Sequence, residues 1–313
     1  MILDLLKINK AEAHVLYIAS EEDAANYGGV DVNILTQPFS NHFYLGLILL
    51  FLLTVSVIFL IVSKSKVIKN WAHVISHRAI SYYELVPWMM RLSLGIALVG
   101  AGVSGFLVSP VLQNFQMMSF LQILTGFLLL SGFMTTIASL LCVIIFLLAL
   151  SQNFYLLGSM DFLAMSFALI ILDSRKPGLD DIFKIPDIKL THLKQYVPVI
   201  LRMGIGSSLI FLSIYEKFLN PNLSSYVVKI TNLTEVINVS TSMWVVSTGL
   251  IELALGLLLF FGVATRFVSA LTFFVLSMSF FYFGESVVSH ITLFGILSVL
   301  FVLGGKKLKH VKD

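Results

Sequence analysis

Long apolar stretches with almost no charge alternate along the chain with short, polar and basic segments. From Leu92 to Met160 no Asp, Glu, Lys or Arg occurs. As one continuous helix this stretch would be roughly 100 Å long, enough to cross a ~30 Å hydrocarbon layer three times. Backbone in lipid must satisfy its own hydrogen bonds, so the pattern predicts membrane-spanning helices.

Nine segments are apolar enough to cross the membrane, one alone and the rest in two groups of four. We expect them at 43–63, 92–109, 117–132, 135–151, 162–172, 197–215, 243–262, 267–284 and 291–304. The sequence therefore predicts an all-α polytopic membrane protein with about nine transmembrane helices. One leading helix is followed by two four-helix bundles.

The composition agrees with this architecture. Apolar residues make up 58% of the chain and charged residues only 12%, whereas soluble domains carry roughly 25% charged residues. This excludes a soluble enzyme and a nucleic-acid-binding protein, and it makes membrane lipid a partner. The single cysteine, Cys142, excludes an internal disulfide. We expect no metal site.

Lysine and arginine are concentrated in three segments, and basic loops normally face the cytoplasm. These segments follow the first span, follow the fifth span, and form the tail. Four spans separate each from the next, so all three can lie on the same side. We expect a cell-membrane protein with its N-terminus outside and its C-terminus cytoplasmic. The loop predicted to face outward holds three glycosylation sequons, at Asn222, Asn232 and Asn238.

The two groups of four helices share a spaced pattern. Two pairs recur in the same order: Arg91 and Gly95 as Arg202 and Gly206, and Gly126 and Gly132 as Gly256 and Gly262. Four spans per unit make both copies begin on the same side, so a duplication would give parallel repeats. The predicted organisation is an extracytoplasmic segment (1–42), a leading helix (43–63), a cytoplasmic amphipathic segment (64–84), a first repeat (85–180), a linker (181–196), a second repeat (197–305) and a basic tail (306–313).

The repeated unit resembles the DoxX-like family of four-helix membrane proteins. The second copy carries the residues that make up the resemblance: Arg202, Gly206, Lys217, Glu252, Gly256, Gly262 and the Thr265-Arg266 turn. The first copy has Gln122 in place of Glu252 and Thr136 in place of Arg266. The segment that begins at Val86, with an extra span before it, resembles a longer archaeal branch of the family. Some members resemble the DoxD-type membrane subunit of a thiosulfate:quinone oxidoreductase, which implies a quinone as possible cofactor.

Charged residues inside a membrane are costly and are therefore candidates for function. Glu252 is predicted near the middle of its span, so the second repeat is expected to hold a polar catalytic site centred on it. Lys217, Arg202 and His290 are its predicted supporting groups. Arg202 lies several turns away in depth and could approach Glu252 only through a steep helix tilt or a water-filled path.

Three functions are compatible with the sequence, and it leaves open whether the chain is an enzyme. The first is an integral membrane subunit of a quinone-linked electron-transfer system. The second is a non-catalytic scaffold or assembly subunit of a larger membrane complex, and both imply other subunits as partners. The third is a small-solute transporter that uses the interface between the two bundles, although paired broken helices are lacking.

Overall fold

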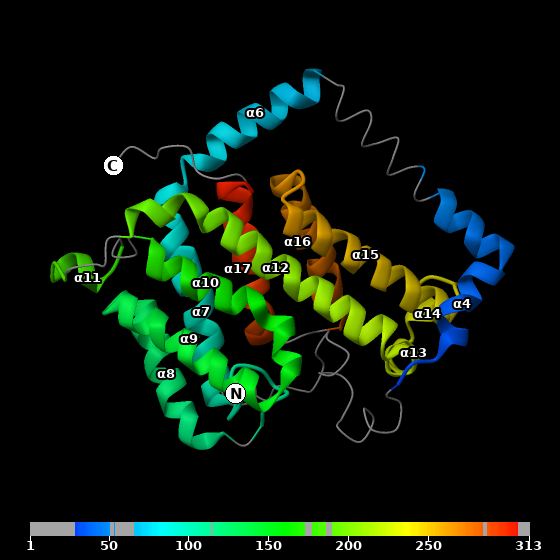
Figure 1. Cartoon of the computed structure of the whole chain (residues 1–313), viewed down its shortest axis with the longest axis horizontal. Helices are drawn as coiled ribbons and strands as arrows, with labels where there is room; N and C mark the ends of the chain where they lie inside the picture. The colour runs from blue at the N-terminus through cyan, green and yellow to red at the C-terminus, as the bar shows by residue number, and fades with distance from the viewer. Residues whose placement is uncertain are drawn as a thin grey trace.

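The computed structural model describes residues 29–50, 53, 66–113, 115–172, 177–185, 190–283 and 287–305. Within these ranges the regular elements are all helices, and the β-structure is limited to an isolated bridge between Leu107 and Ser109. Figure 1 shows the long helices gathered into one bundle, with α6 (Lys66–Ile80) extending away from it.

The first half of the bundle consists of α7 (Val86–Val103), α8 (Gln116–Ser131), α9 (Thr135–Gln152), the short helix η2 (Phe154–Ser159) and α10 (Met160–Ile171). The second half consists of α12 (Val197–Leu212), η4 (Ser213–Phe218), α15 (Thr241–Phe261), α16 (Thr265–Phe283) and α17 (Val287–Leu303). Short helices connect or flank the two halves: η1 (Tyr83–Leu85), α11 (Leu179–Ile182) and η3 (Thr191–Tyr196).

The described residues contain six helices long and apolar enough to cross a membrane, and two shorter apolar helices. These eight helices coincide with eight of the predicted spans, which confirms an all-α, multi-pass membrane protein. The remaining predicted span, 43–63, lies mostly outside the described residues. Residues 42–50, where it begins, are helical.

Corresponding signals begin and end the helices of the two halves. Pro87 and Pro198 lie at the start of α7 and α12, where a missing N–H costs nothing. Gly132 ends α8 with φ 65°, and Gly262 ends α15 with φ 75°. A left-handed residue at this position normally requires glycine, so both helices stop where the sequence repeats its second glycine.

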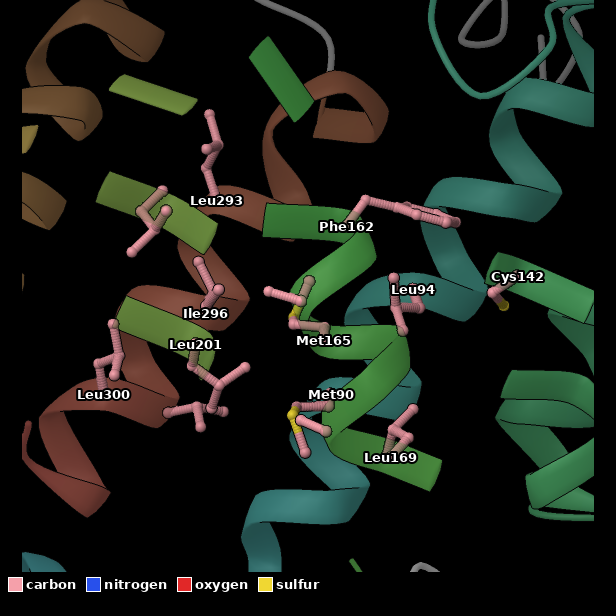
Figure 2. Packing of buried hydrophobic residues seen from close by; sticks show 14 of the residues in the cluster. Met90, Leu94, Cys142, Phe162, Met165, Leu169, Leu201, Leu293, Ile296 and Leu300 are labelled. Atoms are coloured by element: carbon pink, nitrogen blue, oxygen red, sulfur yellow. The ribbon is translucent and has the colours of Figure 1, made fainter. Parts of the chain in front are cut away.

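The two halves pack against each other reciprocally. The last helix of the first half, α10, lies against α12, and the last helix of the second half, α17, lies against α7. Figure 2 shows α10 between α7 and α17, with Met165 facing Met90, Leu201 and Ile296. All four side chains are fully buried. The junction between the halves is therefore an apolar core.

Glycines allow close helix contacts at corresponding places in both halves. A Cβ on Gly126 would lie 2.8 Å from the Gly95 carbonyl oxygen, and one on Gly256 would lie 3.1 Å from that of Gly206. Close approach of backbones through small residues is a principal packing mode of membrane helices.

The loop predicted to face outward contains two helices, α13 (Pro221–Ile230) and α14 (Leu233–Val236), which the sequence analysis did not anticipate. α13 packs on α15 and η4, and α4 (Val32–Ser40) packs on α13 and α15, so these short helices gather at one end of the bundle (Figure 1). Of the sequon asparagines, Asn232 and Asn238 are exposed and Asn222 is half-buried.

Candidate functional site

Three charged side chains from two neighbouring elements meet inside the second half. The Lys217 ammonium nitrogen lies 2.6 Å from Glu216 Oε2 and 3.7 Å from Glu252 Oε2. Glu216 and Lys217 are buried. A charge at membrane depth costs about 2.5–3.5 kcal/mol or more unless it is paired or hydrated. We call Glu216, Lys217 and Glu252 the charged cluster.

A local change in helix geometry positions Glu216 and Lys217. They lie in η4, a turn of π-helix that continues α12 and closes with a 2.9 Å bond from Leu219 N–H to Ile214 O. Ser213 Oγ donates to the Gly249 carbonyl oxygen at 2.8 Å, and a Cβ on Gly249 would lie 2.9 Å from Lys217 Cβ. The small residue on α15 thus leaves room for the lysine stem. Turns of this kind are frequent at functional sites.

The first half contributes Tyr155 of η2 to the charged cluster. Its hydroxyl donates a hydrogen bond to Glu216 Oε1, while Ser224 Oγ of α13 donates to the Glu216 carbonyl oxygen at 2.6 Å. The Tyr155 ring also packs against Phe211 and Tyr215. Glu216 is therefore held from two other elements, η2 and α13, and the cluster lies where the two halves meet.

Glu252 is the member of the cluster that reaches the molecular surface. Of its side-chain surface, 31% is exposed, although Oε2 is buried and accepts no hydrogen bond from a described residue. Two carboxylates share one ammonium, so a proton or one further cation would balance the cluster. The arrangement can hold and release a proton at the edge of a membrane-spanning helix.

The DoxX family model matches residues 197–285. This region is a DoxX domain. The match covers α12, η4, α15 and α16, and so includes the whole charged cluster. It confirms the predicted resemblance for the second half of the chain. No curated protein and no solved structure matches the chain.

Within the DoxX domain, Arg202 lies away from the charged cluster. Its Nη1 donates to the Phe260 carbonyl oxygen at 2.6 Å, and its guanidinium lies against Gly262. Phe260 follows Glu252 by eight residues, or about 12 Å along the helix. Arg202 therefore caps the far end of α15, and Lys217 is the cation beside Glu252.

His290 lies just beyond the matched DoxX residues, on α17. Its side chain is buried, and its ring centroid lies 6.1 Å from that of Phe280 on α16. The structure thus brings together two of the four predicted site residues, Glu252 and Lys217. Glu216 was recognisable as the carboxylate next to Lys217 in sequence, whereas no sequence signal connects Tyr155 of the other half to the DoxX domain.

The corresponding position in the first half is uncharged. Gln122 is fully buried on α8, where its Nε2 donates to the Phe106 carbonyl oxygen at 2.6 Å and its Oε1 accepts from Val108 N–H at 2.8 Å. Both bonds go to backbone, so Gln122 fixes the chain after α7. The first half has a structural amide where the DoxX domain has a carboxylate.

Proposed function

We propose that this chain is an integral membrane subunit of a quinone-linked electron-transfer system, in which the charged cluster supplies or accepts protons. A quinone that takes up two electrons must also take up two protons. The observation that supports this role most directly is Glu252, a paired carboxylate on a membrane-spanning helix with 31% of its side chain exposed. A lipid-soluble quinone travels within the bilayer, so a carboxylate at such a surface is within its reach.

In this proposal each member of the cluster has a distinct task. Glu252 exchanges a proton with a quinone oxygen, and Lys217 holds the carboxylate in place at 3.7 Å. Glu216, which accepts a hydrogen bond from Tyr155 and is paired with Lys217, is the second carboxylate, from which the proton is replaced. Electrons come from another subunit of the complex. In this proposal the cluster faces the outer side of the cell membrane, the orientation that the positive-inside pattern predicts.

Replacement of Glu252 by glutamine tests the role. E252Q keeps the shape of the side chain and its capacity for hydrogen bonds but carries no exchangeable acid proton. In membranes that contain the native complex, we expect the quinone reduction rate to fall by about 10²-fold or more, the usual contribution of a positioned acid or base. The amount of inserted protein and its melting temperature should stay near wild type.

Two matched variants control this experiment. Q122E introduces a carboxyl group at the corresponding position of the first half and should add no turnover. E235Q makes the same chemical change on the exposed Glu235 of α14 and should leave the rate unchanged. Full quinone-linked activity in E252Q would reject the proposed role and favour the scaffold or assembly subunit.

A further inference from the structure

Asp161 is a buried carboxylate at the junction between the two halves, outside the charged cluster. It lies in the first turn of α10 and is 1% exposed. Its backbone N–H donates to Ser208 Oγ of α12 at 3.1 Å, and Thr292 of α17 lies beside its side chain. Three helices from both halves therefore meet at one acidic group.

No cation accompanies this carboxylate in the part of the chain that the structure describes. The described ion pairs are those of Lys217, and Asp161 Oδ2 has no hydrogen-bond partner. The titratable groups on the elements around it are Arg91 on α7, Cys142 on α9, Tyr155 in η2, Arg202 on α12, Tyr215, Glu216 and Lys217 in η4 and His290 on α17. A buried carboxylate without a counter-charge must hold a proton or bind a cation.

The hydroxyl of Ser208 can form a hydrogen bond with Asp161 in either protonation state of the carboxyl group. Ser208 Oγ lies 3.2 Å from Asp161 Oδ1 and also 3.2 Å from the Gly204 carbonyl oxygen, but a hydroxyl has only one hydrogen to donate. When Asp161 is ionised, Ser208 donates to the carboxylate. When Asp161 is protonated, its O–H can donate to Ser208 Oγ, and Ser208 donates to Gly204 instead.

The oxygen atoms around Asp161 favour a proton over a metal cation. The oxygens placed at the site are the two of the carboxylate, the hydroxyls of Ser208 and Thr292 and the Gly204 carbonyl bonded to Ser208, whereas Ca²⁺ takes six to eight oxygens and Mg²⁺ six. Toward the other end of α12, the fully buried Met90, Met165, Leu201 and Ile296 close the junction (Figure 2). Glu216 lies in the opposite direction, eight residues or about 12 Å beyond Ser208.

We propose that Asp161 is a proton-binding site at the junction of the two halves. The proton resides on the carboxyl group and is donated to Ser208 or Thr292. Its release transfers the Ser208 hydrogen bond from the Gly204 carbonyl to Asp161, so the hydrogen bonds between α10 and α12 report whether the site is occupied. The site is separate from Glu252 and does not depend on quinone chemistry.

Infrared difference spectroscopy of the full chain in lipid nanodiscs tests this proposal. A protonated carboxyl group has a C=O stretching band that shifts on exchange into D₂O. At neutral pH we expect such a band in the wild type and its loss in D161N, with the band unchanged in D181N, which alters an exposed aspartate. E252Q should retain the Asp161 band, which distinguishes this site from the charged cluster.

Two further measurements cover the other outcomes. If D161N fails to fold, S208A keeps Asp161 and removes its hydrogen-bond partner, so its band should persist at a shifted frequency. An unshifted band in S208A, or an unchanged band in D161N, overturns the proposal. Loss of the wild-type band on addition of NaCl at constant pH would assign the site to sodium and also overturn it.

Discussion

The two halves use the same contact position for different chemistry. In the first half, Gln122 on α8 reaches across to the Phe106 carbonyl oxygen at 2.6 Å. In the DoxX domain, Glu252 on α15 reaches across to Lys217 at 3.7 Å. By the spacing of the repeated pattern, Phe106 corresponds to Lys217 and Gln122 to Glu252. A polar contact between the first two helices is thus common to both halves. Charged side chains make this contact only in the second half.

A second pair of positions shows the same relation. A Cβ on Gly102 of α7 would lie 2.9 Å from the Ser119 carbonyl oxygen. At the corresponding place in the DoxX domain, Ser213 Oγ donates to the Gly249 carbonyl oxygen at 2.8 Å. In both halves the backbones approach closely at this point. The glycine lies on the first helix in the first half and on the second helix in the DoxX domain. Close packing is therefore shared, whereas the room for a lysine stem belongs to the DoxX domain.

The largest expected effect comes from removing the cation of the charged cluster. K217M leaves the buried Glu216 beside the partly exposed Glu252 without a counter-charge, and breaking a buried ion pair in this way costs up to about 3–5 kcal/mol. We expect a lower melting temperature in detergent. In a chain of this size, each kcal/mol of lost stability lowers the melting temperature by about 2–4 °C or less. The triple variant E216Q/K217M/E252Q removes all three charges and should recover most of the loss.

A melting temperature of K217M equal to wild type would contradict the comparison. It would mean that the cluster is hydrated and that the Lys217 ammonium contributes little to the stability of the protein. Equal losses in K217M and in the triple variant would point instead to the packing of the lysine stem against Gly249.

Glycine at the helix contacts gives the next largest effect, and it should differ between the halves. A Cβ on Gly206 would lie 2.7 Å from the backbone nitrogen of Phe260, whereas one on Gly95 would lie 2.7 Å from Leu130 Cγ, a side-chain atom, and 3.0 Å from the nearest backbone atom, the Gly126 carbonyl oxygen. Backbone cannot move aside as a side chain can. G206A should therefore cost about 1–3 kcal/mol, the usual range for overpacking, and G95A less. Thermal unfolding of both variants measures this difference, and a larger loss of stability in G95A than in G206A would contradict the prediction.

The sequence predicted the helices well because a membrane span can be recognised from its local composition. Charge-free runs locate the spans, but not every boundary: the span predicted at 92–109 is the helix Val86–Val103, which begins beside Pro87. The site was predicted only in part. Depth along a span identified Glu252, but contacts between elements depend on the π-turn of η4 and on the packing of η2 against α12, and neither has a local sequence signal.

Arg202 illustrates the limit of prediction from depth. From the sequence we expect Arg202 to support Glu252 through a steep helix tilt or a water-filled path. A guanidinium also binds well to the free carbonyls at a helix end, however, and Arg202 does so here. Arg266 behaves in the same way: its Nε donates to Phe301 O, and its Nη2 to Val302 O, both at 3.0 Å at the end of α17. Arginine beside a helix-ending glycine is thus a capping pattern in this chain.

The smallest effect concerns the start of the third helix of each half. Asp180 accepts hydrogen bonds from Met134 N–H at 2.6 Å and from Thr135 N–H at 2.8 Å, and so caps α9. The corresponding Thr265 of α16 has a buried Oγ1 with no partner among the described residues. D180A removes an N-terminal cap, which usually costs about 0.5–2 kcal/mol.

We therefore expect D180A to lower the melting temperature modestly and to increase amide hydrogen exchange in the first turn of α9. D181A, at the exposed neighbouring aspartate, is the matched control and should change neither. The first turn of α16, which lacks such a carboxylate in the described chain, should exchange faster than that of α9 in the wild-type protein. Equal exchange at the two turns, with no change in D180A, would mean that the cap contributes nothing and that the halves do not differ here.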